Sequence, residues 1–267
     1  MAQRLFFLLH VPKCAGSTVE HHFELHSGDG FLRVPRWKNP LRNIIGNRYH
    51  KTFIQKRLEN VKVASGHSLS SGLRAFLPDH VICETVLLRD PLSYLVSFYN
   101  YRWSRYVNDQ GPKPPQFEKW YSTQRKNPIS RFILNRYLDY GVPLIYGLSS
   151  QARLDIIEDR LKDFHFVGSY KLTDKMIRGI SEELGIPSRS VSQNVTPHRK
   201  IMIQDIDPVL RDRIESENAV DRFLFERWKH RGWVKTYRPA AATNLPKFDQ
   251  PIYLADDSYT AIAKIAG

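Results

Sequence analysis

The 267-residue chain lacks several features that mark whole classes of protein. Its two cysteines, Cys14 and Cys83, are too few to build a disulfide framework or a zinc site by themselves. The apolar run from Leu5 to Leu9 is far shorter than the roughly 18 residues of a membrane helix and shorter than the core of a secretory signal. These absences predict a reduced, cytoplasmic protein without a transmembrane segment.

Acidic residues are also scarce relative to basic ones. The chain has 27 Asp and Glu against 40 Lys and Arg, which gives a net charge of +13. Such a surplus favours anionic partners, namely nucleic acid, an acidic polysaccharide, a membrane face or a phosphorylated cofactor. It does not choose among them, and a generally basic, solvated surface is the alternative.

The residues that are present alternate between strand-like and helix-like patterns. Short apolar runs predict buried strands at residues 4–10, 61–65, 80–88 and 165–170. Apolar residues at helical spacing predict helices at residues 17–26, 91–106, 116–139, 150–163, 173–184 and 208–231. This alternation predicts an α/β fold, a single P-loop-like domain with a central, mostly parallel β-sheet flanked by helices.

The pattern also suggests where this domain ends. Residues 1–235 carry the alternating elements and the positive charge, so we expect them to form the domain. Residues 236–267 have balanced charges and several prolines, and they are expected to be an arm or extension. Within the domain, residues 27–60 mix glycine and proline with basic and aromatic residues, which predicts mostly irregular structure.

The segment HVPKCAGST, from His10 to Thr18, joins the first predicted strand to the first predicted helix. Backbone N–H groups at such a junction favour an anion, so the segment is a candidate phosphate site. Lys13 adds a positive charge, Gly16 allows close approach of the backbone, and Ser17 adds a hydroxyl donor, as does Thr18. An ordinary strand–helix turn with one solvated lysine is the alternative.

This segment is not a Walker A motif. That motif requires Gly-Lys-Ser/Thr, whereas Lys13 here precedes Gly16. The strand at residues 80–88 ends in Arg89-Asp90 and therefore has no clean Walker B acid. The sequence thus predicts a phosphate-bearing ligand that does not depend on Mg²⁺, and no metal site.

A second candidate phosphate site lies at Arg89, where a predicted strand meets a helix, with Ser97 further along that helix. An arginine at the carboxyl end of a parallel strand faces the crevice where α/β proteins bind ligands. Its guanidinium can bind a phosphate through two hydrogen bonds. The alternative is that Arg89 pairs with Asp90 or Glu84.

Together these segments resemble the sulfotransferases that use 3′-phosphoadenosine 5′-phosphosulfate (PAPS), in particular the carbohydrate branch of heparan sulfate and uronyl 2-O-type enzymes. HVPKCAGST is similar to that family's 5′-phosphosulfate loop, and LLRDPLSYLVSFYNY to its 3′-phosphate motif. FHFVGSYKLTDKMIRGISEELG and NVTPHRK are weaker matches to later family segments. The resemblance covers roughly residues 4–230, and Cys14-Ala15 departs from the more usual Thr-Gly.

The resemblance implies transfer of a sulfuryl group from PAPS to a hydroxyl of a saccharide or other acceptor, anionic ones included, with no metal. Lys13 would stabilise charge on the bridging oxygen, and His67 would accept the proton of the acceptor hydroxyl. Glu20 or His21 is the alternative base, in which case His67 would be a hydrogen-bonded strand-end residue. The residues expected to bind the cofactor are Pro12, Lys13, Cys14, Ala15, Gly16, Ser17, Thr18, Arg89, Ser97, Tyr170, Arg199 and Lys200.

Some of these expectations have structural alternatives. Arg199 and Lys200 would close over the 3′-phosphate, with Asn194 or Thr196 orienting their loop, unless this is a solvated basic turn. Tyr170 would contact the adenine, unless it is a core tyrosine. The residues that could line a sugar cleft, or else belong to the core, are Trp37, Trp103, Trp120, Tyr101 and Arg105.

Two other functions remain open. A P-loop-type ATP-dependent kinase is opposed by the missing Gly-Lys-Ser/Thr motif. A non-enzymatic binder of acidic polymers would use the net charge alone and would leave the spacing of Lys13, Arg89 and Ser97 unexplained. Nucleic acid is therefore not an expected partner, and the sequence leaves the acceptor and the oligomeric state open.

Overall fold

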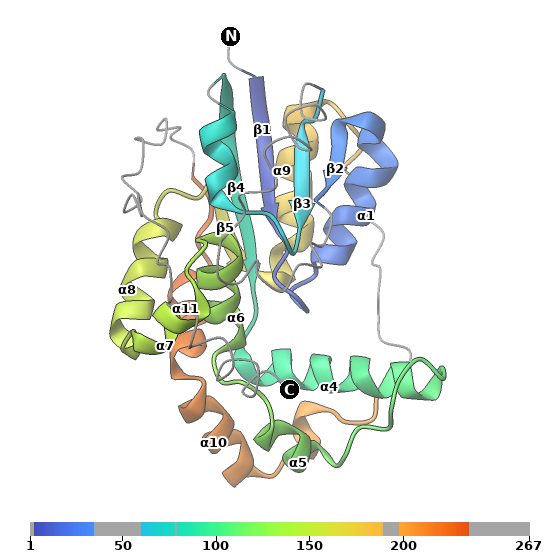
Figure 1. Ribbon diagram of the computed structural model, residues 1–267. Coiled ribbons are helices and arrows are strands. Elements are labelled where there is room, and N and C mark those ends of the chain that lie inside the picture. The colour runs from blue at the N-terminus through green and yellow to red at the C-terminus, as the bar shows by residue number, and fades with distance from the viewer. Residues whose placement is uncertain (1–2, 35–59, 78, 189–197, 235–267) are drawn as a thin grey trace, which may run out of the picture.

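The computed structural model describes residues 3–34, 60–77, 79–188 and 198–234, and they form an α/β fold around one sheet (Figure 1). Six strands of the described chain pair in the order β2-β3-β1-β4-β5-β6. Every neighbouring pair is parallel except β5 and β6. The strands are β1 (Gln3–Leu9), β2 (Phe31–Arg33), β3 (Val63–Gly66), β4 (His80–Leu88), β5 (Phe166–Ser169) and β6 (Gly232–Trp233). The predicted mostly parallel α/β fold is confirmed.

Helices cover both faces of the sheet, and one long helix crosses its carboxyl edge. In Figure 1, α1 and α9 lie on one side of the strands and α6, α8 and α11 on the other, while α4 runs below the strand ends. The α-helices are α1 (Gly16–Ser27), α4 (Pro91–Val107), α5 (Phe117–Ser122), α6 (Pro128–Phe132), α7 (Val142–Gly147), α8 (Ser150–Leu161), α9 (Thr173–Leu184), α10 (Pro208–Glu217) and α11 (Ala219–Trp228). Among the described residues, no helix has the length and apolar character that a membrane span requires.

Shorter helical segments complete the fold. Four of the described segments are 3₁₀ turns, namely η1 (Gly28–Gly30), η3 (Ser71–Phe76), η5 (Tyr170–Leu172) and η6 (Ile203–Asp205). A π-helical turn, η4 (Ile133–Tyr137), directly follows α6. Turns of the 3₁₀ type are common as connectors and at helix ends, and here η5 joins β5 to α9.

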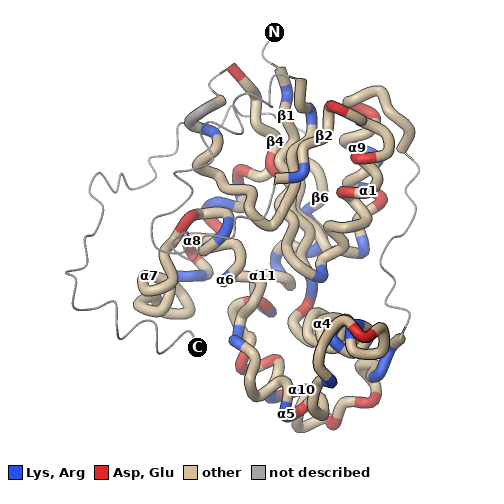
Figure 2. Tube along the Cα trace, turned by 45° about the vertical axis from the view of Figure 1, so that its right-hand side comes forward, with Lys and Arg blue, Asp and Glu red and all other residues tan. Residues whose placement is uncertain are grey.

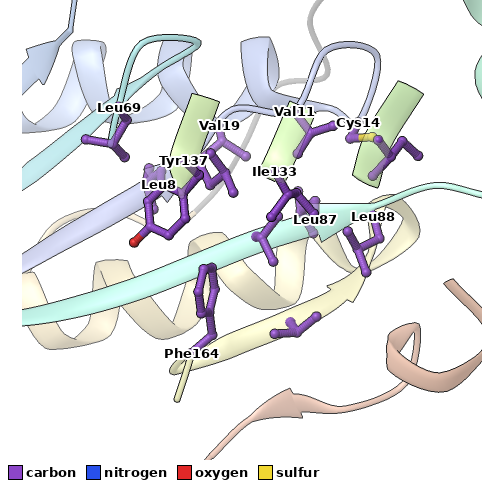
Figure 3. Close-up of a cluster of buried hydrophobic side chains, with 14 of the residues drawn as sticks. Leu8, Val11, Cys14, Val19, Leu69, Leu87, Leu88, Ile133, Tyr137 and Phe164 are labelled. Atoms are coloured by element: carbon purple, nitrogen blue, oxygen red, sulfur yellow. The ribbon is translucent and has the colours of Figure 1, made fainter. Parts of the chain in front are cut away.

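The central strands are buried on both faces, which explains their nearly continuous apolar sequences. Every residue of β1 from Leu5 to Leu9 is buried. The core extends into the segment after β1: Figure 3 shows Val11 and Cys14 in one cluster with Leu87 and Leu88 of β4. Apolar packing therefore anchors the turn that follows β1 to the neighbouring strand.

The helix predicted over residues 208–231 is wrong in one respect, because it is two helices, α10 and α11, separated at Asn218. The Asn218 side chain is fully buried. Its Oδ1 accepts a hydrogen bond from the Asn127 backbone N–H at 2.7 Å, and its Nδ2 donates to the Ile214 carbonyl at 2.7 Å. The bond to Asn127, a distant residue in the sequence, stabilises the break, which helical periodicity does not reveal.

Other predicted elements also differ from the structure. The single helical stretch expected over residues 116–139 is divided into α5, α6 and η4, with Asn127 at a φ of 54° before α6. The sequence analysis missed β2, which lies in the region expected to be irregular, and it missed β6 and α7. The two strands are only three and two residues long, so they carry no periodic signal of their own. The predicted arm at residues 236–267 lies outside the described residues.

Charged residues of both signs are interspersed along the described chain, as Figure 2 shows. Some of the basic positions lie between the strands and α4 (Figure 2). The carboxyl edge of a parallel sheet is also where α/β proteins most often bind ligands. The segments that follow β1, β3 and β4 lie at this edge.

Candidate functional site

The strand order brings the predicted site segments to one edge of the sheet. Strands β3, β1 and β4 are parallel neighbours, with Leu9 of β1 level with Gly66 of β3 and with Val86 of β4. His67 directly follows β3, the segment from His10 to Ala15 follows β1, and Arg89 follows β4. Residues far apart in the sequence therefore meet around the turn after β1.

This turn has the backbone arrangement of an anion site. Lys13 and Ala15 have positive φ angles of 62° and 63°, which cost non-glycine residues on the order of 1 kcal/mol each. Within the described chain, the N–H groups of Lys13, Ala15, Gly16 and Ser17 donate to no protein acceptor. Successive N–H groups at a helix start can together bind an anion. The helix begins at Gly16 with Ala15 as its N-cap, one residue before the predicted start at residue 17.

Lys13 is half-buried and lies against α4. Its Nζ is 4.4 Å from the centroid of the Tyr101 ring. Burial lowers the pKa of Lys13, and the nearby Arg89 charge lowers it further. Both causes disfavour the ammonium ion, so an anion bound between Lys13 and Arg89 would relieve the repulsion between them.

Arg89 holds the turn through its guanidinium group. Its Nη1 donates to the Lys13 carbonyl at 2.8 Å, and its Nε donates to the Ser93 hydroxyl at 2.9 Å. The guanidinium carbon lies 4.3 Å from the centroid of the Tyr170 ring. Two of the five N–H donors of an arginine are thus used, and the remainder can bind a ligand.

The alternative pairings considered for Arg89 are not the ones in the structure. Glu84 is fully buried, and its carboxylate accepts bonds of 2.6 Å from Arg160 and a further bond from Arg74. Asp90 instead caps α4 by accepting a hydrogen bond from the Ser93 N–H at 2.8 Å. Arg89 is therefore positioned by uncharged groups, and its charge is not neutralised by either carboxylate.

The other predicted cofactor residues differ from one another in burial and in the contacts they make. Ser97 is half-buried one turn after Ser93 on α4, and its hydroxyl makes no hydrogen bond to the described residues. Tyr170 lies under Arg89 at the end of β5 and is neither a core residue nor fully exposed. The Cys14 thiol packs in the core and burial raises its pKa, so only the backbone of Cys14 can contact a ligand.

Asn100 is a buried site residue that the sequence analysis missed. Its Oδ1 accepts hydrogen bonds from the N–H groups of Lys200 and Ile201 at 2.9 and 3.1 Å, and its Nδ2 donates to the Ile201 carbonyl at 2.8 Å. These bonds fix the segment after residue 198 against α4, and the Lys200 Nζ lies 4.9 Å from the centroid of the Trp103 ring. An asparagine inside a helix is unfavourable unless its amide has such partners. Its presence within a predicted helix was the signal in the sequence that could have identified Asn100.

The remaining predicted residues of this region do not join the cluster. Arg199 is exposed, and Asn194 and Thr196 lie outside the described residues. Of the proposed sugar-cleft residues, Trp120 is buried against Tyr99 and belongs to the core. Trp37 lies outside the described residues, and Arg105 donates to the backbone of Gln110. The aromatic residues that remain near the site are Tyr101 and Trp103.

Replacing Asn100 by alanine should release the segment that carries Lys200. We expect the free energy of unfolding to fall by about 1–3 kcal/mol because buried backbone groups lose their partners. Affinity for a phosphate ligand should fall by roughly tenfold, since Lys200 is no longer held. Denaturant unfolding and calorimetric titration with adenosine 3′,5′-bisphosphate measure the two effects. Asn108→Ala, at the exposed end of the same helix, is the control, and equal affinity of both variants would exclude this role of Asn100.

His67 is oriented by the residues on either side of it. Its Nδ1 lies 2.8 Å from the His10 carbonyl oxygen. The centroid of its ring lies 4.1 Å from that of the His10 ring. The Phe132 ring packs edge-to-face against it, with the centroids 6.0 Å apart. A carbonyl can only accept, so Nδ1 carries the proton and Nε2 is the basic nitrogen of the neutral ring. This is the tautomer and restraint that a general base at Nε2 requires.

The described residues contain no group of three or more His, Cys, Asp and Glu side chains that could hold a metal ion. What the arrangement provides is a set of cations and backbone N–H groups beside an oriented imidazole. A scan against protein-family models, a search of curated proteins and a search of solved structures each found no match to this chain.

Proposed function

We propose that the chain transfers a sulfuryl group from PAPS to a hydroxyl of a saccharide or another acceptor and releases adenosine 3′,5′-bisphosphate. The observation that carries this proposal is the alignment of His67, the turn with Lys13, and Arg89 on three neighbouring strand ends. Two anion-binding elements and one basic nitrogen are the parts that such a transfer needs.

The donor's charges fit the residues at this edge. PAPS carries a phosphosulfate at its 5′ position and a phosphate at its 3′ position. The sulfuryl group of the phosphosulfate is the part that is transferred. The N–H groups after β1 and the Lys13 ammonium suit the first of these anions. Arg89 suits the second anion. Ser97 lies one turn after Ser93, the partner of Arg89, and Asn100 holds the Lys200 backbone against the same helix. The backbone N–H groups of Lys13, Ala15, Gly16 and Ser17 would bind the first anion, with the other residues from Pro12 to Thr18 lining it.

The transfer requires one proton acceptor and one group that stabilises the leaving charge. The acceptor oxygen attacks the sulfur while His67 Nε2 takes its proton, and the bond from sulfur to the bridging oxygen breaks. Lys13 stabilises the negative charge that grows on that oxygen. Because Lys13 and Arg89 supply positive charge at this point, the proposed step needs no metal ion.

The kinase alternative is distinguished by its nucleotide. A ligand bound only by the native state raises the unfolding midpoint. Adenosine 3′,5′-bisphosphate should therefore raise the midpoint more than ATP with Mg²⁺ at equal concentration. The reverse order would favour a kinase, and no shift with either ligand would favour a non-enzymatic binder.

The activity itself is tested by incubating the protein with ³⁵S-labelled PAPS and a panel of neutral and acidic saccharides. We expect label to move to at least one acceptor at a rate that EDTA leaves within twofold, because the turn lacks the Lys-Ser/Thr pair that positions Mg²⁺. Lys13→Met should abolish the transfer, whereas Lys171→Met, at an exposed lysine, should not. Loss of turnover in EDTA with recovery in Mg²⁺ would contradict the proposal.

A further inference from the structure

A buried polar cluster lies directly behind His67, formed by His10, Glu20 and Ser65. The Glu20 carboxylate is only 8% exposed, as is the His10 side chain. Glu20 Oε1 is 2.7 Å from His10 Nδ1 and accepts a hydrogen bond from the Ser65 hydroxyl at 2.9 Å. Its second oxygen, Oε2, is 3.3 Å from Nε of Arg33. Strands β2 and β3, the turn after β1, and α1 thus meet at one carboxylate.

The proton positions in this cluster follow from the partners of Glu20. Burial raises the pKa of Glu20, but hydrogen bonds from His10 and Ser65 and the charges of His10 and Arg33 outweigh it and lower the pKa overall. Glu20 is therefore ionised at neutral pH and can only accept. His10 Nδ1 must carry the proton that it shares with Glu20, which fixes the orientation of the His10 ring.

The His10 ring is held on its other sides as well. A Cβ on Gly16 would lie 2.0 Å from His10 Cδ2, so the glycine is required for the ring to pack under the start of α1. This is a different use of Gly16 from the close anion approach expected from the sequence. His10 then contacts His67 twice, through its ring at 4.1 Å and through its carbonyl, which accepts from His67 Nδ1.

We propose that Glu20 and His10 are positioning residues, which hold His67 in the orientation that makes Nε2 its basic nitrogen. Glu20 fixes the His10 ring, and the His10 ring and carbonyl fix His67. This inference rests on the proposed function, in which His67 is the base. It also assigns Glu20 a role other than the base itself, because Oε1 already accepts from two donors and the carboxylate is buried.

The test compares two substitutions of Glu20 with a matched control. Glu20→Ala should lower kcat roughly 10- to 100-fold and leave the affinity for adenosine 3′,5′-bisphosphate within twofold, since Glu20 touches no anion-binding group. Glu20→Gln keeps an oxygen that accepts from His10 and Ser65, so its kcat should stay within about threefold of the wild type. Glu24→Ala is the control, because Glu24 is an exposed residue of the same helix that also pairs with Arg33.

Three kinetic outcomes would overturn the positioning role. The first is a folded Glu20→Ala protein whose kcat lies within threefold of the wild type. The second is Glu20→Gln as impaired as Glu20→Ala, which would mean that the charge and not the acceptor matters. The third is an equal loss of kcat and bisphosphate affinity, which would indicate a structural role alone.

A measurement without turnover separates this inference from the proposed function. In protein labelled with ¹⁵N at its 10 histidines, long-range ¹H–¹⁵N spectra distinguish Nδ1–H from Nε2–H imidazoles, and His67→Ala assigns the His67 signals. We expect His67 as the Nδ1–H tautomer in the wild type and as a mixture in Glu20→Ala. An Nε2–H tautomer in the wild type, or an unchanged His67 signal in Glu20→Ala, would overturn the inference. An absence of sulfuryl transfer together with the expected spectra would overturn the proposed function only.

Discussion

Replacement of His67 by alanine should lower kcat by roughly 10²–10⁴-fold, the usual size of a general-base effect. Affinity for adenosine 3′,5′-bisphosphate should change by less than about twofold, because the His67 Nδ1 is bound to the His10 carbonyl and its ring neighbours among the described residues are His10 and Phe132 rather than Arg89 or Lys13. Steady-state assays with labelled PAPS and calorimetric titration measure these two quantities. The fold should survive, since a strand-end side chain that is only partly buried is removed.

Two further measurements make this prediction sharp. Free imidazole added to His67→Ala should restore part of the rate, because it fits the space that the ring leaves between His10 and Phe132. His21→Ala, which removes an alternative base on α1, should behave as the wild type. A His67→Ala rate within a few-fold of the wild type would assign the base to Glu20 or His21. Equal losses of rate and bisphosphate affinity would instead make His67 structural.

Replacement of Arg89 by alanine should weaken the binding of adenosine 3′,5′-bisphosphate by about 2–4 kcal/mol, or roughly 30- to 1,000-fold. Two losses combine in this figure. The ligand loses a charged hydrogen-bond donor, and the Lys13 carbonyl loses the guanidinium that holds the turn in its positive-φ conformation. Arg89→Lys should lie between the wild type and Arg89→Ala, because it keeps the charge but not the planar fork of donors.

A ligand comparison shows which of the two losses dominates. The wild type should bind adenosine 3′,5′-bisphosphate more tightly than adenosine 5′-phosphate, which lacks the 3′ group. If Arg89 binds the 3′-phosphate, Arg89→Ala should remove most of this preference. The four affinities form a cycle that isolates the interaction between Arg89 and the 3′-phosphate. Arg105→Ala, on the helix that follows Arg89, should keep the preference. An Arg89→Ala protein that binds the bisphosphate as tightly as the wild type would exclude the assignment.

Much of the fold could be predicted because its signals are local. The strand expected at residues 80–88 is β4 with the same bounds, since a long run of β-branched and apolar residues suits a strand buried on both faces. The helix expected at residues 173–184 is α9, and it ends where expected because Gly185 adopts the left-handed conformation, with φ of 66°. Each of these signals acts within one strand or one helical turn.

Parts of the candidate site could be placed in the same way. Parallel strands end at a common edge, so the positions of Lys13, His67 and Arg89 just after predicted strands were enough to expect them near one another. The sequence could not show that Arg89 would donate to the Lys13 carbonyl rather than pair with Glu84. That choice depends on Arg160 and Arg74, which pair with Glu84 in the core.

The tertiary structure alone decided the contacts that orient the site. Asn100 meets Lys200 across 100 residues of sequence, and Glu20 meets Ser65 across 45. The break at Asn218 depends likewise on Asn127, 91 residues away. Periodicity and capping report only the interactions of a residue with its near neighbours along the chain. A buried polar side chain instead takes its partner from whichever strands and helices pack beside it, because leaving it unpaired away from water is costly.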